Sequence, residues 1–339
     1  MTAQVLESPQ GKSKIKIENV LYSPALQRVL AFAALIVLIV VFSIASPNFL
    51  QFRNITGILL ATAVNGILAL GVTFVIITAG IDLSIGTVMT FSAVMTGVFI
   101  TRWGFDPLLG VLCGILSGSF AGMINGIVIA KMKVPPFVAT LGMMYMAKGL
   151  ALIIAELRPI YFNDVPGFST IATGSVVGSI LPDFNIPNAV MIMFIAAIVG
   201  SFILFKTILG RYTFALGSNE EATRLSGVNV DLWKIAVYTL SGTFAGLAGV
   251  VIAARLNSAQ PALGQGYELD AIAAVVIGGT SLSGGEGSIL GTIIGAFVIS
   301  VLTNGLRILS VPQEWQIVVT GVIIIVAVYF DMVRRRRSR

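Results

Sequence analysis

Long apolar runs separated by short polar segments dominate this sequence from residue 29 onward. Each run is close to the roughly 20 residues that a helix needs to cross a bilayer core of about 30 Å. We predict ten membrane-spanning helices, near residues 29–46, 55–79, 84–101, 108–130, 136–156, 188–205, 235–254, 268–279, 288–306 and 315–330. The eighth run is short and flanked by glycine, so we expect a tilted or re-entrant half-helix there. The pattern predicts an all-α polytopic membrane protein with one membrane domain over residues 29–330.

Positive charges are distributed unevenly between the two sides of the predicted spans. Fifteen of the 21 Lys and Arg residues fall on the side that carries both chain ends, five fall on the other side, and Lys148 lies within a span. Because Lys and Arg concentrate in cytoplasmic loops, we expect both ends in the cytoplasm, as tails over residues 1–28 and 331–339. The same bias places the polar segment 206–234 in the cytoplasm and the loop 157–187 outside.

The composition agrees with a lipid environment and limits the available chemistry. Hydrophobic residues make up 56% of the chain and charged residues 11%, whereas soluble domains carry about 25% charged residues. The chain has no His and a single Cys, Cys113, so it offers no His-based zinc site, Ser-His dyad or disulfide framework. We predict no catalytic residue, no metal site and no cofactor on this chain. We assign the net charge of +6 to membrane topology rather than to nucleic-acid binding.

The polar segment 206–234 contains the signature of a short capped helix. Residues 218–221, Ser-Asn-Glu-Glu, read as a capping box in which the first and last residues exchange hydrogen bonds. Gly227 stands where a left-handed C-terminal cap belongs. A helix of about two turns is unstable alone in water, and its apolar residues Ala222 and Leu225 share one face. The segment is either built to fit the groove of a partner or an ordinary cytoplasmic loop with one helical turn.

Glycine recurs at every fourth position on one face of three predicted spans. The positions are Gly114, Gly118, Gly122 and Gly126 in the fourth span, Gly242 and Gly246 in the seventh, and Gly291 and Gly295 in the ninth. Small residues at this spacing let helix backbones approach closely. We expect these stripes to pack helices within the chain, with a subunit interface as the alternative.

Four polar residues inside or beside the spans are candidates for lining a translocation path: Asn65, Asp82, Lys148 and Asn304. Charge inside a membrane is costly and points to function, but each residue has a structural alternative. Asp82 can cap the third span, and the two asparagines can hydrogen-bond between helices; for these three we favour the structural role. Lys148 lines a path, snorkels outward or pairs with Glu156, and the sequence leaves these alternatives open.

A short motif, G-x-x-L-S-x-G, occurs at residues 80–86 and again at residues 279–285. Both copies fall on the cytoplasmic side in the predicted topology. Transporters are often built from internal repeats, so the pair hints at a repeat in this chain.

Two predicted external segments, 157–187 and 257–270, mix aromatic, acidic and proline residues. Such a surface suits the docking of another protein, with loop filler as the alternative. The candidate docking residues are Arg158, Asp164, Asp183 and Glu268. We also expect Glu268, together with Asp270, to stabilise the start of the eighth span through the helix dipole.

Three strings of residues carry a resemblance to a known family. They are AGIDLSIG at 79–86, LGRYTFALGSNEEATRLSGVNV at 209–230, and ARLNSAQPALGQGYELDAIAAVVIGGTSLSGGEGSILGTIIGA at 254–296. In these strings the chain closely resembles the ribose-type sugar permeases of bacterial ABC importers. That family includes xylose, arabinose and galactoside permeases, with autoinducer-2 permeases as close relatives. The resemblance runs from about residue 30 to residue 330.

The resemblance implies a permease of the vitamin-B12-importer-like fold in the bacterial inner membrane. It implies a second permease copy, cytosolic ABC ATPase subunits that bind ATP and Mg²⁺, and a periplasmic binding protein that delivers a monosaccharide such as ribose. In such importers a short cytoplasmic helix of the permease fits a cleft on the ATPase. The matching ATPase-coupling positions here are Gly217, Ser218, Asn219, Glu220, Glu221, Ala222, Arg224, Leu225 and Gly227.

The competing class is an ion-coupled secondary transporter of small polar solutes. Such proteins place ionisable residues near the bilayer midplane, whereas Lys148 is the one serious charge within a predicted span. The sequence therefore favours the ATP-driven importer, in which this chain is a conduit and not an enzyme.

Overall fold

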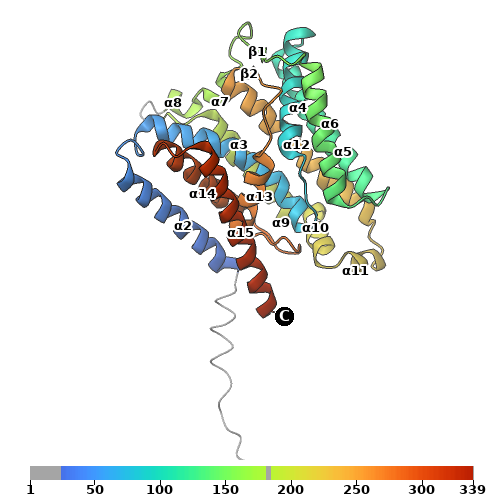
Figure 1. Ribbon diagram of the computed structural model, residues 1–339. Helices are drawn as coiled ribbons and strands as arrows, with labels where there is room; N and C mark the ends of the chain where they lie inside the picture. The colour runs from blue at the N-terminus through green and yellow to red at the C-terminus, as the bar shows by residue number, and fades with distance from the viewer. Residues whose placement is uncertain (1–23, 181–184, 339) are drawn as a thin grey trace, which may run out of the picture.

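A computed structural model describes residues 24–180 and 185–338, and it shows a bundle of helices (Figure 1). The longer helices are α2 (Pro24–Ala45), α3 (Phe52–Ile77), α4 (Ile85–Gly97) with its π-helical continuation η1 (Val98–Arg102), α5 (Pro107–Ala130), α6 (Pro136–Ile154), α9 (Asn188–Lys206), α12 (Val230–Leu256), α14 (Ile289–Ile308) and α15 (Gln313–Ser338). The shorter ones are α7 (Thr170–Thr173), α8 (Val176–Ile180), α10 (Ile208–Ser218), α11 (Glu220–Leu225) and α13 (Tyr267–Ile277). Two-residue strands β1 (Ile160–Tyr161) and β2 (Ser258–Ala259) pair antiparallel, with Ile160 opposite Ala259.

Eight of the described helical segments are long and apolar enough to cross a membrane. They correspond to the first seven predicted spans and the ninth. The eighth predicted span is α13, a helix of 11 residues, which rises only ~16 Å at 1.5 Å per residue. The tenth predicted span lies in α15, whose described apolar part covers Gln313–Val326. The prediction of an all-α polytopic membrane protein is confirmed, and so is the short eighth element.

Helix α3 lies at the centre of the bundle, and every residue from Thr62 to Ile77 is buried. A helix that is apolar on all sides suits such a position. α2 has a largely exposed surface and packs against α14, where the ring of Phe42 covers Gly305.

The glycine stripes pack helices against each other within the chain, as predicted. A Cβ atom built on Gly122 would collide with the backbone of α12 at Tyr238, and one built on Gly118 would lie 2.6 Å from the carbonyl oxygen of Gly242. In the same way α14 meets α13 at Gly291 and Gly295. Because the backbones touch with no side chain between them, α5 and α12 form a closely packed pair.

The two ends of the bundle carry different segments (Figure 1). Helices α10 and α11 and the C-terminal end of α15 lie at one end, and β1, β2, α7 and α8 lie at the opposite end. This is the relative arrangement that the charge distribution predicts for the segments 206–234 and 157–187. Most of the predicted tail 1–28 and the docking candidate Asp183 lie outside the described residues, as do the side chains of the basic tail 331–339.

Candidate functional site

The polar segment 206–234 folds into two short helices, α10 and α11, separated by Asn219. The Thr207 hydroxyl accepts a hydrogen bond from the Gly210 N–H at 3.5 Å at the start of α10. Asn219 has extended backbone angles, which end α10, and its Oδ1 accepts from the Ala222 N–H at 2.9 Å. An asparagine in this position caps a helix by satisfying one of its free backbone donors.

The prediction that Ser218 caps the short helix is wrong. Ser218 is the last residue of α10, and the cap of α11 is its neighbour Asn219. The reason is that α10, which the sequence analysis did not predict, takes Ser218 into its final turn, and asparagine is as good an N-cap as serine. Glu221 consequently lies in the first turn of α11, where its carboxylate interacts favourably with the helix dipole.

The other end of α11 agrees with the prediction. Gly227 has a φ of +83°, and its N–H donates to the Arg224 carbonyl at 3.0 Å, which is the left-handed ending expected of glycine. Of the six residues of α11, all of them described, Thr223 is buried. Ala222 is exposed and Leu225 is 84% exposed, so this apolar face is open to a partner.

A junction of glycines fixes the end of α10 to the membrane helices. We call it the glycine joint: Gly217, Gly284, Gly285 and the last turn of α3. The Gly285 N–H donates to the Ile77 carbonyl at 2.9 Å. A Cβ on Gly217 would collide with that carbonyl and lie 2.5 Å from the Gly285 nitrogen. Gly284 has a φ of +80° and lies against Ala79, so the second copy of G-x-x-L-S-x-G contacts the residue just before the first.

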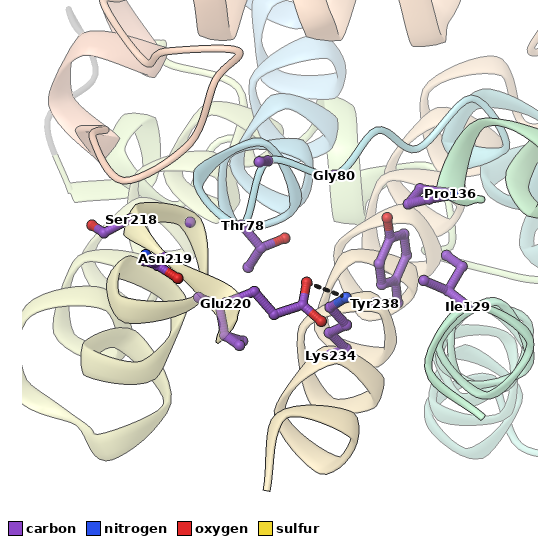
Figure 2. Close-up of a pocket in the computed structure, with 12 residues that line it drawn as sticks. Thr78, Gly80, Ile129, Pro136, Ser218, Asn219, Glu220, Lys234 and Tyr238 are labelled. Carbon is purple, nitrogen blue, oxygen red and sulfur yellow. Dashed lines mark ion pairs between the residues drawn. The ribbon is translucent and has the colours of Figure 1, made fainter. Parts of the chain in front are cut away.

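A cavity of about 400 Å³ separates the junction of α10 and α11 from the helices behind it. Its lining comes from the turn after α3 and from α5, α6, α10, α11 and α12: Thr78, Ala79, Gly80, Ile129, Pro136, Leu216, Gly217, Ser218, Asn219, Glu220, Lys234 and Tyr238. Figure 2 shows Glu220 and Lys234 pointing toward each other from opposite sides, and their charged atoms lie 2.7 Å apart.

Glu220 is ionised in this setting. Burial acts to raise the pKa of its carboxyl, but the hydrogen bonds and positive charges of Lys234 and Arg224 outweigh burial and hold the pKa below its usual value. Arg224, four residues further along α11, pairs with Glu220 at 3.1 Å.

The four path candidates lie on separate elements and do not line this cavity. Asn304 on α14 donates to the Asn54 side chain on α3 at 3.0 Å, which confirms the expected hydrogen bond between helices. Asn65 is buried within α3. Lys148 on α6 donates to the Gln265 side chain at 2.9 Å, so the suggested pairing with Glu156 is wrong.

Glu156 pairs instead with Arg102, at 3.2 Å. The reason is that the last turn of α6 brings Glu156 to the end of η1, whereas Lys148 faces the segment before α13.

Asp82 holds three segments together and is only 2% exposed. Its Oδ1 accepts from the backbone N–H and the hydroxyl of Ser84, at 3.0 and 2.7 Å, and its Oδ2 accepts from the Ser241 hydroxyl at 2.9 Å. The Asn125 amide donates in turn to the Ser84 hydroxyl at 2.9 Å. The prediction that Asp82 caps the third span is wrong, because the N-cap of α4 is Ser84. Asp82 still has a structural role, since its two carboxylate oxygens join the start of α4 to α12 and, through Ser84, to α5.

The docking candidates have different accessibilities. Arg158 and Asp164 are exposed. Glu268 is only 6% exposed, and both its carboxylate oxygens accept from the Gly266 N–H, at 3.0 and 3.1 Å. Because its carboxylate is used inside the turn that starts α13, Glu268 does not belong to an exposed docking surface. It does lie in the first turn of α13, as does Asp270, as expected from the helix dipole.

The sequence did not predict that three charged residues belong to this site: Lys133, Asp231 and Lys234. Lys133 pairs with Asp231 at 2.8 Å although 98 positions separate them. Only the spacing of Glu220 and Arg224, at i and i+4, was visible in the sequence as a pair. The long-range partners follow from the fold and have no local signal.

The chain belongs to the family described as branched-chain amino acid transport system / permease component, whose profile matches residues 54–328. It is therefore a membrane permease, in agreement with the helices long enough to cross a membrane.

Among its relatives are sugar permeases from several bacteria. The chain is 42% identical over 311 residues to the ribose import permease protein RbsC of Bacillus subtilis (strain 168), covering 91% of this chain and 94% of that protein. It is 43% identical over 301 residues to RbsC of Escherichia coli (strain K12), covering 88% and 91%. The fructose import permease protein FrcC of Rhizobium meliloti is 39% identical over 293 residues, covering 85% and 80%. These comparisons confirm the resemblance to ribose-type sugar permeases.

Proposed function

We propose that this chain is the membrane-spanning permease of an ATP-driven importer for ribose or a closely similar monosaccharide. The observation that supports this most strongly is the 42–43% identity to ribose import permeases over most of the chain. Relatives named for fructose and xylose are 39% and 33% identical, so the same fold serves several sugars and ribose is the favoured one.

The proposed assembly holds two copies of this chain, cytosolic ABC ATPase subunits and a periplasmic sugar-binding protein. Helix α11 enters a cleft on the ATPase, which covers the open face of Ala222 and Leu225. ATP and Mg²⁺ bind to the ATPase and not to this chain. The exposed Arg158 and Asp164 belong to the surface that meets the binding protein.

No covalent step takes place on this chain in the proposed mechanism. Closure of the ATPase subunits displaces α11, and the paired permeases then alternate between an outward and an inward opening. A short capped helix with an exposed apolar face suits this role, since the partner supplies the packing that the helix lacks on its own.

Reconstitution into lipid vesicles tests the proposal. Labelled ribose is expected to accumulate only when ATPase subunits, binding protein and ATP are all present, with unlabelled xylose and fructose competing weakly. Uptake by the permease alone under an ion gradient would instead support the secondary transporter. ATP-dependent uptake of leucine without uptake of any sugar would contradict the proposed substrate class.

A further inference from the structure

Five charged side chains of alternating sign form a continuous series beside α11, which we call the ion chain: Lys133, Asp231, Arg224, Glu220 and Lys234. Asp231 Oδ1 lies 2.8 Å from Lys133 Nζ and 3.7 Å from Arg224 Nη2. Glu220 lies 3.1 Å from Arg224 and 2.7 Å from Lys234. Each acidic residue therefore lies between two basic ones.

The ion chain joins α11 and the start of α12, which follows α11 after four residues, to the distant turn between α5 and α6. Lys133 lies in the turn between α5 and α6, Glu220 and Arg224 lie on α11, and Asp231 and Lys234 lie in the first turns of α12. An isolated ion pair at the surface contributes little to stability. In a continuous series, each side chain is already held by a neighbour, so less conformational entropy is lost for each further pair.

Charged side chains of α11 contact α12 directly. The cavity of about 400 Å³ lies on this side, and Glu220 and Lys234 line it from opposite walls (Figure 2). The ion pairs from Glu220 to Lys234 and from Arg224 to Asp231 link α11 to α12 beside this cavity.

The backbone at Lys133 supplies an independent argument. Its φ is +58°, in the left-handed region that is strained for an ordinary residue and favours glycine. Such strain is found where the surrounding structure or the function requires the residue. At this position the side chain reaches Asp231, which a glycine cannot do.

We propose that Lys133, Asp231 and Lys234 are positioning residues that carry the displacement of α11 to the membrane helices. This inference rests on the proposed function and assigns the route of the movement. α11 is joined covalently to α10, which the glycine joint holds against α3. On its other side α11 continues through residues 226–229 into α12. The ion chain ties α11 to the first turns of α12 and to the α5–α6 turn, and α5 packs on α12 backbone to backbone. Movement of α11 is therefore passed to α12 and, through the close packing of the two helices, to α5.

The test is the number of sugar molecules imported per ATP hydrolysed, in vesicles that hold the complete importer. Lys133→Gly and Lys234→Gln are expected to retain the ATPase subunits and to hydrolyse ATP, while the ratio of sugar to ATP falls roughly threefold, a factor typical of losing one exposed ion pair. Lys133→Gly is the sharper variant, because it relieves backbone strain and removes only the side chain. Lys206→Gln, which removes an exposed charge at the end of α9, serves as the matched control and keeps the wild-type ratio.

A covalent replacement gives a second readout. The double variant combines Glu220→Cys with Lys234→Cys in a Cys113→Ser background. It is expected to import fewer sugar molecules per ATP hydrolysed than the wild type. The wild-type ratio should return when a short bis-methanethiosulfonate joins the two thiols. An unchanged ratio in both single variants would overturn the inference. If these variants lost ATPase binding together with uptake, the inference would also be overturned, because the substituted residues would then contact the ATPase directly. Absence of ATP-dependent uptake in the wild-type importer is a separate result, which would contradict the proposed function itself.

Discussion

Two glycines near α11 are required for different physical reasons. A Cβ on Gly217 would collide with the backbone of Ile77 and Gly285, whereas a Cβ on Gly227 would meet nothing within 4 Å. Gly227 is needed for its φ of +83°, a conformation that costs other residues roughly 1–2 kcal/mol. Gly217 is needed because any side chain there would collide with neighbouring backbone, and Gly227 because it adopts a left-handed backbone conformation.

This difference predicts distinct results for matched substitutions. Gly217→Val is expected to lower the melting temperature of the detergent-solubilised protein clearly more than Gly227→Val, because backbone atoms must move to admit the side chain. Gly227→Val is expected to insert normally and to abolish uptake, and Gly227→Asn to remain close to wild type, since asparagine tolerates left-handed angles. Equal melting temperatures for the two valine variants would contradict the glycine joint.

The cap of α11 can be tested by comparing alanine substitutions at Asn219 and at its neighbour Ser218. Asn219→Ala removes the acceptor of the Ala222 N–H and should destabilise α11 by about 1 kcal/mol. Amide hydrogen exchange over residues 220–226 should then be roughly fivefold faster. Ser218→Ala should leave it nearly unchanged, and the reverse order would show that Ser218 is the cap after all.

At the residue scale, the sequence predicted which types of residue cap the short helix, but not the position at which that helix begins. The left-handed Gly227 was predictable because a glycine after a short helical pattern has one common use. The choice between Ser218 and Asn219 depended on where α10 ends, and both residues are good caps. The burial of Glu268 depended on the turn at Gly266 that encloses it, for which the sequence has no distinct signal.

At the scale of elements, α11 depends on charge as well as on packing. The pKa of Glu220 is held below its usual value of about 4.5. A carboxyl of this kind adds stability above its unfolded pKa and loses it as the pH falls through the folded pKa.

This pH dependence can be tested by comparing the melting temperatures of wild type and Glu220→Gln from pH 3 to pH 7. The wild type should be the more stable of the two by a constant margin above about pH 5, and the margin should shrink as the pH falls through the lowered pKa of Glu220. A margin that grows as the solution becomes more acidic would show that burial, and not the ion pairs, controls this group.

The lengths of the elements were largely legible in the sequence, because apolar runs record how much of a helix lies in lipid. The short α13 was anticipated from its flanking glycines. α10 was missed because it lies within a segment that was read as one polar loop, and because Gly210 and Gly217 disfavour a helix. Packing against α9, α3 and α12 stabilises it.

At the scale of the whole molecule, the sequence predicted the fold class and the grouping of segments at the two ends of the bundle. The glycine stripes were correctly expected to act within the chain, since the spacing alone shows which helix faces approach closely. The ion chain could not be predicted from the sequence, because Lys133 and Asp231 meet only after α5 and α12 have packed.

The account depends most directly on α11 being exposed to the cytosol and covered by the ATPase. Leu225→Cys in a Cys113→Ser background places one thiol on the exposed face of α11. In inverted membrane vesicles, a membrane-impermeant maleimide is expected to label this thiol, and bound ATPase subunits should protect it. Labelling from the outer face of right-side-out vesicles, or labelling that bound ATPase leaves unchanged, would contradict the account.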